Sequence, residues 1–142
     1  MTMKSYQDEI KKKIRPIMRD HDLAKFGDSL TNFLYSLAKT KSLSHPYGEH
    51  VLDKSLAEAI KNLNLRSLMP SSSSAGDIGD GAEALVGYAY LNDLLTLKEM
   101  ELIIMKIMVE KGFNENYTRN QEREIMQLSF EKLIEEILQR IK

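Results

Sequence analysis

Apolar residues recur every three or four positions along most of this chain, and that spacing restricts the possible folds more than any other feature of the sequence. The spacing matches the period of an α-helix, in which such residues form one apolar face. No segment shows the alternation of β-branched residues around a tight turn that indicates a hairpin. The sequence therefore predicts an all-α protein.

Six helices are expected, over about residues 6–18, 23–38, 52–63, 79–93, 97–111 and 120–141. Pro16 should bend or end the first helix, because proline lacks the N–H that a helix interior needs. Thr96 and Glu99 have the spacing of a capping box, and Gly112 is suited to the residue after a helix end. The segment 69–79, with four consecutive serines, is predicted to be a mobile loop.

The composition favours one globular domain over residues 1–142. Apolar residues make up 42% of the 142 residues and charged residues 29%, the balance of a folded protein. The absence of cysteine excludes disulfides, a thiolate nucleophile and cysteine-based zinc sites. No apolar run approaches the ~18 residues of a membrane span, and the N-terminus is too polar for a signal peptide. We therefore expect a cytoplasmic protein with no membrane partner.

The charge is distributed unevenly along the chain. The formal net charge is −1, but residues 1–66 carry a net charge of +4 and residues 67–142 a net charge of −5. One face could therefore hold a polyanion while another repels it, although a solvated charged surface would give the same pattern.

Two segments interrupt the helical pattern with glycines and acids. Gly27 and Asp28 lie within an apolar helical stretch, where glycine costs about 1 kcal/mol relative to alanine. Close approach of a second helix would offset that cost. In the segment 79–84, Asp80 and Glu83 are three positions apart and share one helix face. If the two helices pack through their small residues, Asp28, Asp80 and Glu83 would converge.

Converging carboxylates repel one another, by roughly 4 kcal/mol for two charges about 4 Å apart at an effective dielectric near 20. They would be tolerated only if partly protonated or bound to a cation. Oxygen ligands suit Mg²⁺, with Mn²⁺ as a substitute, and such a cation can activate water toward a phosphodiester. The alternative is structural: Asp80 would stabilise a helix start through the macrodipole, and Glu83 would be a capping partner.

The order and separation of the two segments resemble the endonuclease domain of the ribonuclease III family. Residues 23–29, Leu-Ala-Lys-Phe-Gly-Asp-Ser, are similar to the family signature Leu-Glu-Phe-Leu-Gly-Asp-Ser/Ala. Residues 79–88 follow the later motif Ala-Asp-x-x-Glu-Ala-x-x-Gly-Ala. The motif-bearing core covers about residues 20–112, and a C-terminal helix about residues 120–141. The chain resembles most the compact archaeal members and the Mini-ribonuclease III enzymes.

The resemblance implies a homodimeric helical fold in which Asp28, Asp80 and Glu83 are catalytic and bind metal, Mg²⁺ or Mn²⁺. The implied reaction is hydrolysis of phosphodiesters in double-stranded RNA, leaving 5′-phosphate and 3′-hydroxyl ends, as in RNA processing. Each subunit would cut one strand, and DNA is not an expected substrate. Phe26 and Phe33 are expected in the core or at the dimer contact.

The sequence departs from the bacterial pattern in two places. Ala24 stands where bacterial members have a catalytic glutamate, and His21 replaces another acid. Mini-ribonuclease III also has a small residue at the position of Ala24, so an active enzyme is the favoured interpretation. The alternatives are a catalytically inactive relative that binds structured RNA in a ribonucleoprotein, and a helical interaction module with a coincidental match.

RNA contacts are expected from the dimer surface, because the 30 residues after Gly112 predict a single helix and no double-stranded RNA-binding domain. The main candidates are Lys25, Lys54 and Arg66, with Lys39 among the further ones, although each could be an ordinary surface residue. The serine loop could flex over the RNA backbone or be a plain connector.

Overall fold

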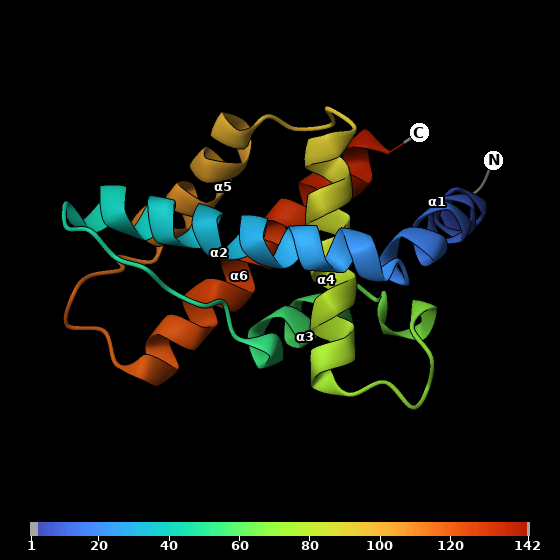
Figure 1. Ribbon diagram of the computed structural model, residues 1–142, viewed down its shortest axis with the longest axis horizontal. Helices are drawn as coiled ribbons and strands as arrows, with labels where there is room; N and C mark the ends of the chain where they lie inside the picture. Colours follow the sequence, from blue (N-terminus) through green and yellow to red (C-terminus); the bar gives the residue numbers. More distant parts are fainter. Residues whose placement is uncertain (1–2, 142) are drawn as a thin grey trace.

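Residues 3–141 are described by the structure, a computed structural model, with side chains from residue 8 onward. This part of the chain is all-helical and contains no strand, as predicted (Figure 1). The elements are α1 (Met3–Met18), α2 (His21–Leu43), α3 (Asp53–Asn62), the 3₁₀-helix η1 (Arg66–Leu68), α4 (Ala75–Leu91), α5 (Leu97–Glu110) and α6 (Arg119–Arg140). None of these helices is both long enough and apolar enough to cross a membrane.

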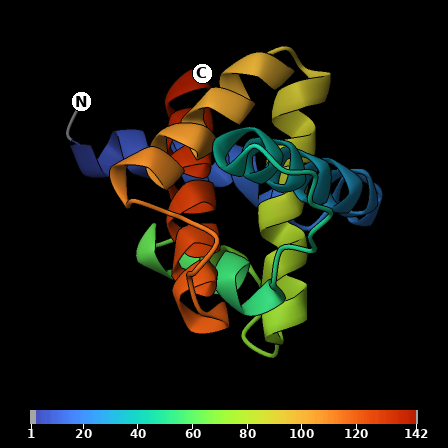
Figure 2. The same ribbon diagram turned by 90° about the vertical axis from the view of Figure 1, so that its left-hand side faces the viewer.

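Helix α2 crosses α4 in the centre of the molecule, and the other helices pack around this crossing (Figure 1). The view turned by 90° shows α4 and α6 running upright, with α5 across their upper ends and α3 near their lower ends (Figure 2). One side of the α2–α4 crossing is bordered by α3, the end of α1 and the segment after η1, and the candidate site lies there.

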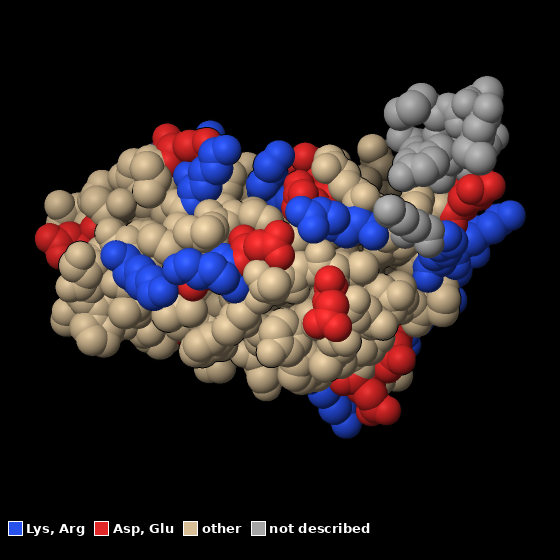
Figure 3. All heavy atoms as spheres, turned by 90° about the horizontal axis from the view of Figure 1, so that it is seen from above, with Lys and Arg blue, Asp and Glu red and all other residues tan. Residues whose placement is uncertain are grey.

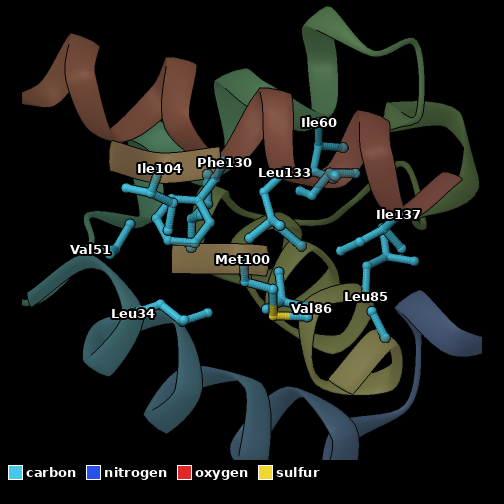
Figure 4. Close-up of a cluster of buried hydrophobic side chains, with 14 of the residues drawn as sticks. Leu34, Val51, Ile60, Leu85, Val86, Met100, Ile104, Phe130, Leu133 and Ile137 are labelled. Carbon is cyan, nitrogen blue, oxygen red and sulfur yellow. The ribbon is translucent and has the colours of Figure 1, made fainter. Parts of the chain in front are cut away.

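The core is a single apolar cluster to which α2, α4, α5 and α6 all contribute (Figure 4). Leu34, Val86, Met100, Phe130 and Leu133 are completely buried in it. Burial of each such side chain contributes about 1.5–3 kcal/mol. The apolar stripe along α6 is therefore buried within the domain.

The aromatic side chains of α2 divide between core and surface. Tyr35 is completely buried, whereas Phe26 is 37% and Phe33 51% exposed. Phe26 and Phe33 are thus not core residues, and a dimer contact by them stays a prediction.

The two ends of α5 agree with the sequence. Thr96 and Glu99 form the predicted capping box, and Gly112 has a φ of +66°. Helix α1 ends at Met18, as predicted, and Pro16 lies inside it rather than ending it. The side chain of Met18 is buried in the core.

Helix α4 begins earlier than expected. Ser74 and Asp77 form a reciprocal capping box, so the helix starts at Ala75 rather than near residue 79. The prediction that the loop continues to Gly79 was therefore wrong: the glycines of this segment belong to the first turns of a helix.

Candidate active site

The crossing of α2 and α4 depends on glycines. A Cβ at Gly27 would overlap the main-chain carbonyl of Glu83, and a Cβ at Gly87 would lie 3.0 Å from the carbonyl oxygen of Leu23. The two backbones therefore touch, which confirms that a second helix approaches Gly27 closely. This contact places Glu83 directly beside the face of α2 that carries Asp28.

An acidic hollow of about 360 Å³ opens beside the crossing. Asp28, Asp80 and Glu83 all border it, as the sequence predicted. Its complete lining is His21, Ala24, Lys25, Asp28, Asp53, Asp80 and Glu83. Asp80 is the sixth residue of α4, and Asp77 rather than Asp80 or Glu83 completes the cap. A capping role therefore does not explain these two acids.

Glu83 is the most deeply placed of the acids, with only 4% of its surface exposed. The hydroxyl of Thr31 donates a hydrogen bond to Glu83 Oε2 at 3.1 Å. Burial, together with the neighbouring Asp28 carboxylate, raises the pKa of Glu83 to about 8. Near neutral pH this carboxyl group is therefore largely protonated unless a positive charge stabilises its ionised form.

Asp80 is subject to the same repulsion. Burial raises the pKa of Asp80, and the carboxylates of Asp53, Asp77 and Asp28 raise it further. The acidic side chains of the hollow therefore outnumber its basic side chains, which are Lys25 and His21.

Asp28 is positioned by Asn32, one helical turn further along α2. The amide nitrogen of Asn32 donates to Asp28 Oδ1 at 3.2 Å and lies 3.3 Å from Nδ1 of His50. The amide oxygen of Asn32 accepts the main-chain N–H of Val51 at 2.8 Å. Asn32 thus ties Asp28 to the segment that leads into α3.

Sequence reasoning missed three residues of this site: Thr31, Asn32 and Asp53. The first two follow Asp28 by three and four positions, so their place on the same helix face was available as a signal. Asp53 is the first residue of α3 and resembles an ordinary first-turn acid. Its carboxylate lies against the start of α4, where a Cβ at Gly79 would be 3.3 Å from Asp53 Oδ1.

The chemistry of the acidic hollow fits a hard divalent cation, because its donors are carboxylate oxygens with little compensating positive charge. Among the described side chains, however, no group of three or more His, Asp or Glu residues is arranged as a ready set of metal ligands. The three predicted acids thus line the same hollow but do not form a set of metal ligands. The Glu83 carboxyl group accepts a hydrogen bond from Thr31 and lies beside the Asp28 carboxylate, which raises its pKa.

The basic residues predicted to contact RNA have different surroundings. Lys25 is exposed at the edge of the acidic hollow, whereas Lys54 lines a separate hollow between α3 and α6. The guanidinium of Arg66 donates to four main-chain carbonyls of the segment after η1. RNA contacts by these three residues stay predictions. Lys39 is buried and paired with Glu122 at 2.8 Å, so its assignment as an RNA contact was wrong.

The described side chains on the upper surface of the molecule do not form a continuous basic face (Figure 3). In Figure 3, Lys and Arg side chains are interspersed with Asp and Glu side chains across the view from above.

Comparison with protein families gives one match. The family model described as Ribonuclease III covers residues 21–142, which include α2 to α6 and every residue of the acidic hollow. No curated protein matches the chain.

Proposed function

Because the chain belongs to the ribonuclease III family, we propose that it is an endoribonuclease that cuts double-stranded RNA with the help of a divalent cation. Family membership supports RNA cleavage in general. The proposal that a divalent cation takes part rests on the acidic hollow, in which burial and Asp28 raise the pKa of Glu83 to about 8. A cation would relieve the repulsion between these groups and return Glu83 to its ionised form.

Three acids of the hollow and two polar neighbours have assigned roles in this proposal. Asp28, Asp80 and Glu83 hold Mg²⁺ or Mn²⁺, which when bound supplies a Lewis acid for the phosphodiester and for water. Asn32 orients Asp28, and Thr31 donates its hydrogen bond to the ionised form of Glu83. These residues keep the carboxylates near their working positions and thereby lower the cost of assembling the site.

Lys25 is proposed to contact a phosphate of the bound strand, because it is exposed at the rim of the hollow. A single lysine here would offset part of the negative charge that otherwise repels RNA. Binding should therefore weaken as salt increases.

The test is incubation of the purified protein with a labelled RNA duplex, with Mg²⁺ and with EDTA. We expect cleavage only with the metal, and poor cleavage of single-stranded RNA and of a DNA duplex. Glu83→Gln should abolish cleavage, whereas Glu58→Gln, which changes an exposed acid on α3, should not. Binding of duplex RNA without any cleavage would instead support the inactive alternative.

We also propose that the protein acts as a homodimer. Phe26 and Phe33 are seven positions apart and thus share one face of α2, where both are exposed. The ring of Phe26 packs against Tyr90, with centroids 6.1 Å apart, which extends this apolar surface onto α4. A second copy would remove it from water. The protein should elute as a dimer, and Phe33→Asp should shift it to a monomer; a monomeric parent protein would contradict this proposal.

A further inference from the structure

A second hollow, of about 380 Å³, adjoins the acidic hollow. We call it the serine-loop hollow, because Ser72 and Ser73 form one of its sides. His21, Ala24 and Asp80 border both hollows, so the two lie side by side. Its volume lies within the range of small-molecule sites, roughly 300–1,000 Å³. Whatever occupies it would touch a substrate bound at the acids.

The serine-loop hollow is preformed, because two arginines hold its wall. The guanidinium of Arg66 donates to the carbonyl oxygens of residues 69, 70, 71 and 73 at 3.4, 3.1, 3.2 and 3.5 Å. Nε of Arg19 donates to the carbonyl oxygen of Leu68 at 2.9 Å. The sequence predicted a mobile segment here, but these bonds fix its path. A preformed wall lowers the cost of ordering a ligand.

The lining of the serine-loop hollow favours a nucleoside over a phosphate. Its apolar part includes Met18, Met69 and Pro70, which suit the face of a base. Its polar part includes three carboxylates, those of Asp20, Asp77 and Asp80, against the guanidinium of Arg19 and the imidazole of His21. Asp20 and Asp77 also cap the N-termini of α2 and α4. A phosphate would be repelled there, whereas the amino groups of a base and the hydroxyls of a ribose could donate to these carboxylates.

We propose that the serine-loop hollow is a subsite for one unpaired nucleoside of the RNA strand whose phosphodiester lies at the acidic hollow. This inference rests on the proposed nuclease function and adds a preference to it. A base must leave the stacked duplex to enter, and that costs least where the base is already unpaired. The preferred substrate is therefore a duplex with a single unpaired nucleotide beside the cut.

The small side chain at residue 24 is what joins the two hollows. Ala24 borders both, and it has the smallest side chain of the three residues that the hollows share. The alanine thus gives this chain room for a nucleoside next to the acids.

The test compares RNA duplexes that are identical except for one unpaired nucleotide, moved stepwise past the cleavage site. The protein should cut the preferred duplex with a kcat/KM about tenfold above that of the fully paired one, because only an unpaired base can bury part of its surface against the apolar wall of the hollow. Ser73→Leu, which fills the serine-loop hollow, should bring that ratio to about one. Ser71→Leu is the matched control and should keep the ratio, because Ser71 shares the loop and the bond to Arg66 but does not line the hollow.

Equal kcat/KM values for all duplexes, or a preference that survives Ser73→Leu, would overturn the inference. A binding measurement separates it from the nuclease proposal: a fluorescent adenine analogue at the unpaired position should change its emission when Glu83→Gln protein binds. That change should be lost in Glu83→Gln protein that also carries Ser73→Leu. If no RNA is cut at all, the nuclease function fails, and the fluorescence alone then decides whether the subsite exists.

Discussion

The hydroxyl of Thr31 on α2 donates a hydrogen bond to Oε2 of Glu83 on α4, across 3.1 Å and 52 positions of sequence. Among the influences on this carboxyl group, the hydroxyl favours the charged form, whereas burial and Asp28 oppose it. The balance leaves the pKa of Glu83 at about 8. The site is therefore sensitive to pH within the range in which proteins are normally studied.

Replacing Thr31 by valine should shift the pH dependence of cleavage. Thr31→Val keeps the shape of the side chain but removes the donor, so the pKa of Glu83 rises further. A hydrogen bond to a charged group contributes about 1.5–3 kcal/mol, so kcat/KM near pH 7 should fall by roughly tenfold or more and recover at higher pH. Cleavage rates measured across pH check this.

Thr40→Val is the control for that experiment. The Thr40 hydroxyl accepts the main-chain N–H of Tyr47 at 2.8 Å, toward the far end of α2. Its loss should cost stability without moving the pH profile. Identical profiles for Thr31→Val and the parent protein would contradict the assigned role of Thr31.

Without divalent cations, stability should fall as pH rises through the range in which Glu83 titrates. The pKa of Glu83 is raised from its usual 4.5 to about 8 on folding, so the folded state binds more protons than the unfolded state between these values. The free energy of unfolding therefore decreases from about pH 4.5 to 8 and loses roughly 2–5 kcal/mol in total. Urea unfolding at a series of pH values measures this.

Glu83→Gln should remove that slope, because glutamine does not titrate, and the variant should be more stable than the parent protein above pH 8. Glu58→Gln should retain the slope. Added Mg²⁺ should stabilise the parent protein most at high pH, where protons no longer compete for the carboxylates. A slope that persists in Glu83→Gln would show that another group causes it.

Gly27→Ala should prevent the close crossing of α2 and α4. The new methyl group would overlap the carbonyl of Glu83, and neither backbone can move without disturbing the core. We expect a loss of more than about 2 kcal/mol in the free energy of unfolding. Gly48→Ala is the matched control, because a Cβ there has no atom within 4 Å. Equal stabilities of the two variants would exclude backbone contact at Gly27.

The helices and the main acids could be predicted from the sequence because their signals are local. Apolar spacing and the pair Thr96 and Glu99 depend on residues three or four positions apart. The interrupted pattern around Gly27 was also sufficient to predict a close helix contact. The start of α4 also has a local signal, because Ser74 and Asp77 have capping-box spacing. The four consecutive serines favour a loop and hide that signal.

The remaining features depend on contacts that no local pattern contains. Asp53 reaches the acidic hollow because α3 packs against α4, and Arg66 holds the serine loop through carbonyl groups that every residue possesses. In the sequence Lys39 resembles a surface residue, because a lysine is rarely buried unless its charge is paired. Its partner, Glu122, is 83 positions away.

That buried pair leads to a last prediction. Lys39 Nζ lies 2.8 Å from Glu122 Oε2 and 3.3 Å from Glu49 Oε1, and the Tyr35 hydroxyl donates to Glu122 Oε2 at 2.8 Å. Lys39→Met would leave the carboxylate of Glu122 buried without its cation, which should cost about 3–5 kcal/mol.

The double variant Lys39→Met/Glu122→Leu should lose less free energy of unfolding than Lys39→Met alone, because no unpaired charge then remains buried.

At temperatures where Lys39→Met stays folded, the salt dependence of its RNA binding should equal that of the parent protein. Lys25→Gln, at the rim of the acidic hollow, should instead lower that slope by about one. Chemical unfolding and binding titrations at several salt concentrations measure both effects. A reduced slope in Lys39→Met would mean that the lysine leaves its buried site to meet the RNA.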